Sequence, residues 1–263
     1  MKVILTTDLH EGFDHKTNRI NKKFINKMAQ EIVDDPDIKV MVITGDLASH
    51  KPKQFPRILK MLRAKIHIPI LVVRGNHDLW GRKEGKFDRD GKWIQPKFPT
   101  IASIYAQQDK WFKDHNIHHF EKDNFKIDDV LFIGWDGWYH SLNPPTNDDY
   151  HMTAYTEGIR TTEWLTRRAE KEFDRVIFDN TEAKHRIAVT HHSPLPSDWL
   201  YRDHAANPKF LQQITCRFDH FLIGHTHQKT DMVIDGCRII NAGSHYNKPK
   251  YKIFEVKETY EIM

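Results

Sequence analysis

Short polar blocks rich in aspartate and histidine follow apolar segments along much of the chain. Together they offer two aspartates, one asparagine and four histidines as candidate metal ligands, with no thiolate among them. Such a set suits Mn, Fe, Zn, Ni or Co better than calcium or copper(I). Seven donors are too many for one open catalytic ion, but they fit two ions that share a bridging carboxylate and clamp a phosphoryl group. The blocks are Asp8-Leu9-His10, Gly45-Asp46-Leu47, Gly75-Asn76-His77-Asp78, His191-His192, Gly224-His225-Thr226-His227 and Asn241-Ala242-Gly243-Ser244.

The segments before these blocks have the composition of buried strands. Each is short, apolar and rich in β-branched residues, and helical patterns lie between them. This alternation predicts right-handed crossovers in an α/β fold, whose ligands bind beyond the carboxyl ends of the strands. Gly45, Gly75 and Gly224 lie at turns out of strands, where the absence of a Cβ lets the backbone approach the ions closely. The predicted strands are 2–7, 40–44, 70–73, 130–133, 186–190, 220–223, 238–240 and 251–256.

Four helices are predicted from apolar residues at 3.6-residue spacing and from capping residues. The first two cover about 20–32 and 55–62, between the first three strands. A third opens at Thr100, which follows Pro99, and a fourth runs from about 162 to 178. The first three strands and their two helices therefore form a strand-helix-strand-helix-strand series.

The middle of the chain departs from this alternation. Residues 81–92 combine three glycines with eight charges and show no apolar period, so they predict a mobile loop near the site entrance. Residues 136–158 are irregular and rich in proline, asparagine and aspartate. We expect one domain, 1–263, with lid-like excursions at about 80–125 and 136–160.

Composition excludes several classes of protein. A chain of 263 residues with 39% hydrophobic and 29% charged residues can bury a sizeable core. The net charge of +4 does not indicate a dedicated nucleic-acid binder, and no run approaches the roughly 18 apolar residues of a membrane span. Cys216 and Cys237 lie outside any C-x-x-C pattern and are predicted to be reduced, structural thiols. The predicted location is the cytoplasm.

The blocks, in this order, resemble those of the calcineurin-like metallophosphoesterases. That family carries Asp-x-His, Gly-Asp, Gly-Asn-His-Asp/Glu, His and Gly-His-x-His, and all five occur here between Asp8 and His227. The resemblance covers most of the chain. It implies a four-layer α/β/β/α sandwich, with a dinuclear metal site at the carboxyl ends of the strands.

The resemblance also implies a role for each residue of the blocks. Asp46 would bridge the two ions, His77 would lie beside the leaving-group oxygen, and Asp78 would orient His77. In the His191-His192 pair the residue directly after the strand is preferred as a ligand, which leaves His192 as an outer or rim residue. The first ion would be held by Asp8, His10 and His227, and the second by Asn76, His191 and His225.

Two further residues are ambiguous from the sequence. Arg74 precedes the Gly-Asn-His-Asp block, where it could contact substrate phosphate, although a surface ion pair is the preferred interpretation. His50 follows Asp46 by four residues and is expected to be exposed.

The expected activity is hydrolysis of a phosphate ester by metal-activated hydroxide, as a phosphodiesterase or phosphatase. The cofactors would be two divalent transition-metal ions, with manganese preferred and iron, zinc, nickel or cobalt as alternatives. Six of seven tryptophans lie within 80–164 among basic residues, which fits stacking of a nucleotide-like substrate or, equally, packing of the excursion onto the body. A nuclease acting on DNA or RNA is an alternative, and a non-catalytic scaffold is disfavoured because every ligand position is retained. The sequence does not determine the oligomeric state or the choice between monoester and diester.

Overall fold

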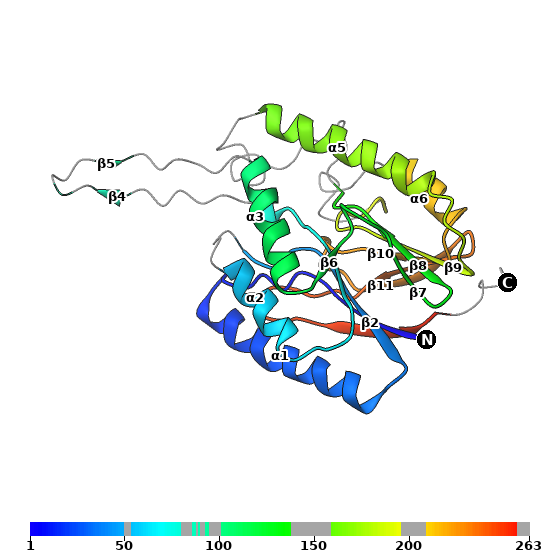
Figure 1. Cartoon of the computed structure of the whole chain (residues 1–263), viewed down its shortest axis with the longest axis horizontal. Helices are drawn as coiled ribbons and strands as arrows, with labels where there is room; N and C mark the ends of the chain where they lie inside the picture. The colour runs from blue at the N-terminus through cyan, green and yellow to red at the C-terminus, as the bar shows by residue number, and fades with distance from the viewer. Residues whose placement is uncertain are drawn as a thin grey trace.

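The fold is given by a computed structural model (Figure 1). The structure describes residues 1–49, 54–79, 101–137, 159–195 and 209–256, together with 86–87, 89 and 93–94. Residues 81–85, His50 and Trp138 lie outside this part of the chain. The expectation of a mobile loop over 81–92 therefore falls mainly on residues that are not described.

The first sheet has the strand order β13-β1-β2-β3-β6. Strands β1, β2, β3 and β6 are parallel, and β13 pairs antiparallel with β1 at the edge. The parallel strands send their carboxyl ends to one edge of the sheet. The strands are β1 (Lys2–Thr6), β2 (Ile38–Thr44), β3 (Ile70–Val73), β6 (His118–His119) and β13 (Tyr251–Glu255).

The second sheet has the order β11-β12-β10-β9-β8-β7. Its four central strands are parallel, and the antiparallel strands β7 and β11 close its two edges. The strands are β7 (Phe125–Ile127), β8 (Val130–Gly134), β9 (His185–Val189), β10 (His220–Leu222), β11 (Thr230–Ile234) and β12 (Cys237–Asn241). A separate short pair joins β4 (Lys86–Phe87) to β5 (Trp93–Ile94).

Alternation of side chains along the strands builds the layers. Val3 and Leu5 of β1 pack in the core between the two sheets, whereas Ile4 points to the helices on the other face. In β8, Val130 and Phe132 likewise face the first sheet. Since both faces of each sheet are covered, the strands are almost continuously apolar, as the sequence predicted.

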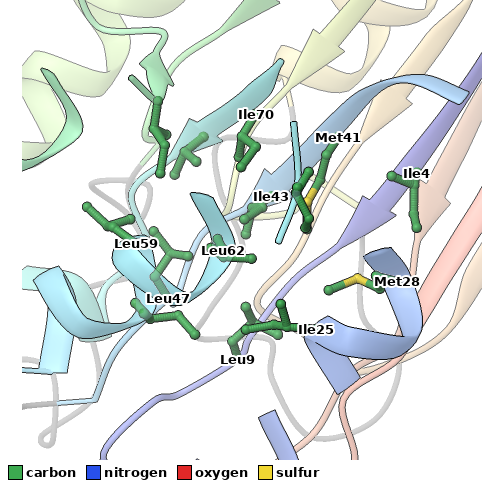
Figure 2. Close-up of a cluster of buried hydrophobic side chains, with 14 of the residues drawn as sticks. Ile4, Leu9, Ile25, Met28, Met41, Ile43, Leu47, Leu59, Leu62 and Ile70 are labelled. Atoms are coloured by element: carbon green, nitrogen blue, oxygen red, sulfur yellow. The ribbon is translucent and has the colours of Figure 1, made fainter. Parts of the chain in front are cut away.

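Helices cover the outer face of each sheet (Figure 1). Figure 2 shows part of the core beneath α1 and α2, where Ile25 and Met28 of α1 and Leu59 and Leu62 of α2 meet strand residues such as Ile43. The opposite core lies beneath α5 and α6. The helices are α1 (His15–Asp34), α2 (Gln54–Arg63), α3 (Ile101–Asp114), α5 (Ile159–Ile177) and α6 (Lys209–Thr215). The α/β/β/α architecture is confirmed.

Part of the stretch expected as an excursion at 80–125 packs onto the first sheet and its helices. Helix α3 packs through Phe112 into the same core as α2, and β6 extends the first sheet beside β3. Trp111 packs against that core, and Trp135 is fully buried beneath α5 and α6, so these two tryptophans serve packing. Among the described helices, none combines the length and the apolar composition needed to cross a bilayer.

Candidate metal centre

The polar blocks converge where the carboxyl ends of parallel strands from both sheets meet. Asp8 follows β1, Asp46 follows β2 and Asn76 follows β3, while His191 follows β9 and His225 follows β10. The two sheets lie face to face, so their ends form one edge with donors on both sides. All seven candidate ligands lie in this one region, in two groups that meet at Asp46.

The first group consists of Asp8, His10 and His227. His227 Nε2 lies 3.4 Å from Asp8 Oδ1 and 3.3 Å from His10 Nε2. His10 Nε2 lies 3.9 Å from the same carboxylate oxygen. Each residue offers one donor atom, and these three atoms lie within 4.8 Å of one another. A single cation can therefore contact all three donors.

The second group consists of Asn76, His191 and His225. Asn76 Oδ1 lies 3.0 Å from His191 Nε2 and 3.1 Å from His225 Nδ1. His191 Nδ1 lies 2.7 Å from the carbonyl oxygen of Thr44. Because a carbonyl oxygen can only accept, His191 carries its proton on Nδ1 and presents the lone pair of Nε2 to the site.

Asp46 lies between the two groups. Its Oδ2 is 3.8 Å from His10 Nε2, and its Oδ1 is 3.5 Å from His191 Nε2. Oδ1 also accepts a hydrogen bond of 2.9 Å from the backbone N–H of His77. One carboxylate thus faces a donor from each group, which is the position that a bridging ligand requires.

The donor set fits divalent transition metals. Within the described residues, Asp8 Oδ1 and His10 Nδ1 are buried and make no hydrogen bond, and two imidazole nitrogens approach to 3.3 Å between His10 and His227. Burial, together with the nearby His77 and His227, lowers the pKa of His10 well below its usual range, so its imidazole is neutral and able to ligate. Buried oxygen and nitrogen lone pairs that have no hydrogen-bond donor nearby are stabilised by a bound cation.

Five of these ligands adopt a backbone conformation that the sequence does not reveal. Asp8, His10, Asp46, His225 and His227 have φ angles of 51°, 45°, 51°, 66° and 56°, in the left-handed region. Such residues are uncommon outside glycine and concentrate at functional sites, where surrounding contacts hold the strain. The strained turns direct each side chain into the centre directly after its strand.

Two glycines make room for the ligands, as their places at strand ends predicted. A Cβ on Gly45, whose φ is +86°, would lie 2.4 Å from His191 Nδ1. A Cβ on Gly75 would lie 2.0 Å from Asp46 Oδ1. Both distances are shorter than any van der Waals contact, so side chains at these positions would displace the ligands.

His77 and Asp78 lie on a single 3-10 turn, His77–Leu79. His77 Nε2 faces Asp46 Oδ2 at 3.9 Å. The Asp78 carboxylate accepts backbone hydrogen bonds of 2.9 Å from both Gly75 and Ala48. Asp78 therefore joins the turn that carries His77 to the loop that carries Asp46.

His192 is not at the rim of the site. It is fully buried, and its ring centroid lies 4.4 Å from that of His225. A ring nitrogen of His192 also lies within 4.8 Å of donors from His191 and His225. Since His191 contacts both Asn76 and Asp46, it stays the better candidate ligand of the pair.

Arg74 is neither a surface residue nor directed at substrate, which corrects both interpretations of the sequence. It is 1% exposed, and its guanidinium pairs with Asp136 at 3.1 Å, with Glu121 and with Asp109. Its backbone N–H donates to Asp136 Oδ1 at 2.8 Å. The acidic partners come from α3, from the turn after β6 and from the segment that follows β8. These segments are distant from Arg74 along the chain, so local sequence pattern does not reveal the cluster.

We expect Arg74→Met to destabilise the fold by about 3–5 kcal/mol, because it removes the cation from a buried cluster and leaves the carboxylate of Asp136 uncompensated. Urea denaturation followed by circular dichroism measures this loss. The matched control is Arg238→Met, which breaks a more exposed pair with Asp231 and should cost about 1 kcal/mol or less. Equal losses in the two variants would contradict a stabilising role for the buried cluster.

Tyr246 is a site residue that the sequence interpretation missed. Its hydroxyl oxygen lies 3.3 Å from His77 Nε2, and its ring stacks on the His10 ring with centroids 4.3 Å apart. The only signal in the sequence is its place two residues after Ser244, the last residue of the Asn-Ala-Gly-Ser block.

Comparisons with known proteins agree with this site and fold. The family model for calcineurin-like phosphoesterase matches residues 1–229, so the chain belongs to the calcineurin-like phosphoesterase family. It is an enzyme that hydrolyses phosphoester bonds. Among curated proteins, the uncharacterized protein L509 of Acanthamoeba polyphaga mimivirus is 21% identical, and the match covers 83% of this chain and 82% of that protein.

Two solved structures share the fold. The phosphopantetheinyl hydrolase of Mycobacterium tuberculosis has a TM-score of 0.62 at 14% identity, covering 92% of this chain and 88% of that one. A putative 5'-nucleotidase of Staphylococcus aureus has a TM-score of 0.52 at 11% identity and covers 98% of this chain. This chain spans 52% of the nucleotidase chain. At these identities the likeness concerns the fold alone.

Proposed function

We propose that this enzyme is a dinuclear metal-dependent phosphoesterase that acts on a small phosphoester, such as a nucleotide. The observation that carries the proposal is the position of Asp46 between two groups of donors. One group would hold the first ion and the other the second, with manganese preferred. When bound, the two ions would withdraw electron density from the phosphoryl oxygens and make water more acidic. The ligands would be Asp8, His10 and His227, then Asn76, His191 and His225, with Asp46 shared.

His77 is proposed as the group that assists departure of the leaving alcohol. Its Nε2 faces Asp46, and its side chain is 11% exposed, so the imidazole is accessible at the mouth of the centre. A histidine in this position can donate a proton to the leaving oxygen or stabilise its charge. Asp78 holds the turn that presents it, through the amides of Gly75 and Ala48.

A small substrate is supported by the names of the two structural neighbours. One is a phosphopantetheinyl hydrolase and the other a putative 5'-nucleotidase, so each is named for a low-molecular-weight group. A panel of nucleotides and other small phosphoesters, assayed with the Mn²⁺-loaded enzyme, identifies the preferred group.

A nuclease acting on DNA or RNA is the second candidate, and a basic groove favours it. The groove has a volume of about 610 Å³ and four lysines but no carboxylate among its lining residues. Lys229, in this groove, follows His227 by only two residues. A nuclease would show rates that fall steeply with salt as lysine–phosphate contacts weaken. The lysines are Lys27, Lys229, Lys250 and Lys252.

We expect about two transition-metal ions per chain after mild purification or Mn²⁺ reconstitution. Elemental analysis measures the stoichiometry. Assays with bis-p-nitrophenyl phosphate and p-nitrophenyl phosphate then separate diester from monoester preference. Chelation should remove the metal and the activity in parallel. A fully active enzyme with one ion or fewer would contradict the dinuclear centre.

We also propose that residues 1–263 form a single domain. Strand β13, near the end of the chain, pairs with β1 along its whole length and completes the first sheet. The reducing cytoplasm is the proposed location, since Cys216 is exposed, Cys237 is buried, and both are free.

A further inference from the structure

Three rings follow one another outward from the candidate metal centre, His10, Tyr246 and Phe13. Tyr246 covers His10 with centroids 4.3 Å apart and an interplanar angle of 23°. Phe13 in turn contacts Tyr246, with centroids 4.5 Å apart. Phe13 is 44% exposed, and its backbone N–H donates to the carbonyl oxygen of the candidate ligand His10 at 3.1 Å. We call the rings of Tyr246 and Phe13 the aromatic wall. Its outer ring, Phe13, faces solvent at the mouth of the site.

The wall lies on the same side of the centre as His77. Tyr246 Oη is 3.3 Å from His77 Nε2, and His77 Nε2 also faces Asp46 Oδ2 at 3.9 Å. The Tyr246 and His77 rings meet edge to face, with centroids 6.2 Å apart. A group that leaves from phosphorus beside His77 would therefore lie next to Tyr246, whose ring contacts Phe13.

Backbone and side-chain hydrogen bonds hold both aromatic residues in place. The loop that carries Tyr246 is closed by His245 N–H to Lys248 C=O at 3.2 Å and by Ser244 Oγ to Lys250 C=O at 3.0 Å. Thr17, in the first turn of α1, donates to Asn247 Oδ1 at 2.9 Å and so joins this loop to the start of the helix. The wall is thus preorganised, which reduces the entropy lost when a ligand binds.

The loop that carries Phe13 is held in the same way. The Phe13 N–H donates to the His10 carbonyl oxygen at 3.1 Å, within the turn that presents His10 to the centre. Asp14, the next residue, caps α1 by accepting from the Thr17 N–H at 2.6 Å. The exposed ring therefore stands on a fixed turn between a candidate ligand and a helix.

We propose that Phe13 and Tyr246 form a leaving-group subsite that accepts an alcohol bearing a planar, apolar group, such as an aryl ring or a nucleobase. The proposal rests on the proposed function, because it uses the place of His77 beside the leaving oxygen. The exposed ring of Phe13 provides the stacking surface, and the Tyr246 ring, which lies between His10 and Phe13, supports it. The Tyr246 hydroxyl acts as a positioning group: without substrate it contacts His77 Nε2 and holds the imidazole in the orientation in which Nε2 meets the leaving oxygen, which takes over this contact when substrate binds.

Binding of two phosphonates by the metal-loaded protein tests the stacking surface without turnover. Isothermal titration should show phenylphosphonate binding about 10-fold more tightly than methylphosphonate, as expected for one stacked ring. Phe13→Ala should bring this ratio close to one. The control Phe178→Ala removes a phenyl ring that is 72% exposed at the end of α5, and it should keep the wild-type ratio. An unchanged ratio in Phe13→Ala would overturn the subsite.

Tyr246→Phe tests the hydroxyl, because it keeps the ring and removes only the hydroxyl oxygen. We expect the ratio of kcat for a p-nitrophenyl ester to kcat for an alkyl ester to rise about three- to tenfold, since the loss falls on the leaving group that needs help. The phosphonate binding ratio should persist in Tyr246→Phe and fall in Tyr246→Ala. Equal losses of kcat on both esters would overturn the positioning role.

These readouts separate failure of the subsite from failure of the proposed function. An enzyme without phosphoesterase turnover would overturn the proposed function, and the phosphonate ratio would still decide the subsite. If the loss of kcat in His77→Ala were the same for good and poor leaving groups, the proposed role of His77 would be overturned. The proposed role of the Tyr246 hydroxyl would be overturned with it. Retention of the binding ratio in Phe13→Ala would overturn the subsite whatever the kinetics show.

Discussion

Asp46→Asn is expected to lose bound metal and activity together. The substitution keeps the size of the side chain but removes the charge and one of the two oxygens that face the donor groups. Metal content should fall from about two ions per chain to one or fewer. Because bound metals supply several kcal/mol of transition-state stabilisation, kcat/KM should fall by roughly 1000-fold or more.

Elemental analysis and steady-state kinetics of the same preparation check this result. Asp231→Asn is the matched control, since Asp231 lies on β11 and pairs with Arg238 and Lys252 away from the centre. That variant should keep the wild-type metal content and activity. Full metal content in Asp46→Asn would show that Asp46 is not the bridging ligand.

The His77→Ala variant is expected to keep its bound metal and to lose most of its catalytic rate. His77 faces the centre, but the two donor groups are complete without it. We expect kcat to fall by about 10²–10⁴ for a diester with a poor leaving group. The loss should shrink for p-nitrophenolate, which leaves readily without protonation.

The measurement pairs metal analysis with kcat for one good and one poor leaving group. His115→Ala serves as control, because His115 lies at the end of α3 with its Nδ1 2.8 Å from the Trp111 carbonyl oxygen. Metal depletion in His77→Ala would make His77 a ligand. Equal losses on both substrates would assign it to positioning and remove the proton-donor role.

Much of the fold was predictable because its signals are local. Runs such as 70–73 are apolar on both faces of the sheet. The eight strands predicted from such runs are all present in the structure. The strands that were missed are short or lie at edges: β6 has two residues, and β11 leaves most of its residues exposed. Such strands are defined by their neighbours in the sheet, and their own composition carries little information.

The candidate ligands were also predictable from local pattern, since polar donors that follow buried parallel strands must meet at one edge. The use of each side chain depends on contacts that form only when the chain is folded. The tertiary structure places Arg74 in a buried ion cluster, buries His192, and brings Tyr246 to His77 across 169 residues of chain. Local pattern does not reveal these features, because burial, ion pairing and left-handed turns depend on contacts between distant segments. These contacts form only when the distant segments are brought together in the folded chain.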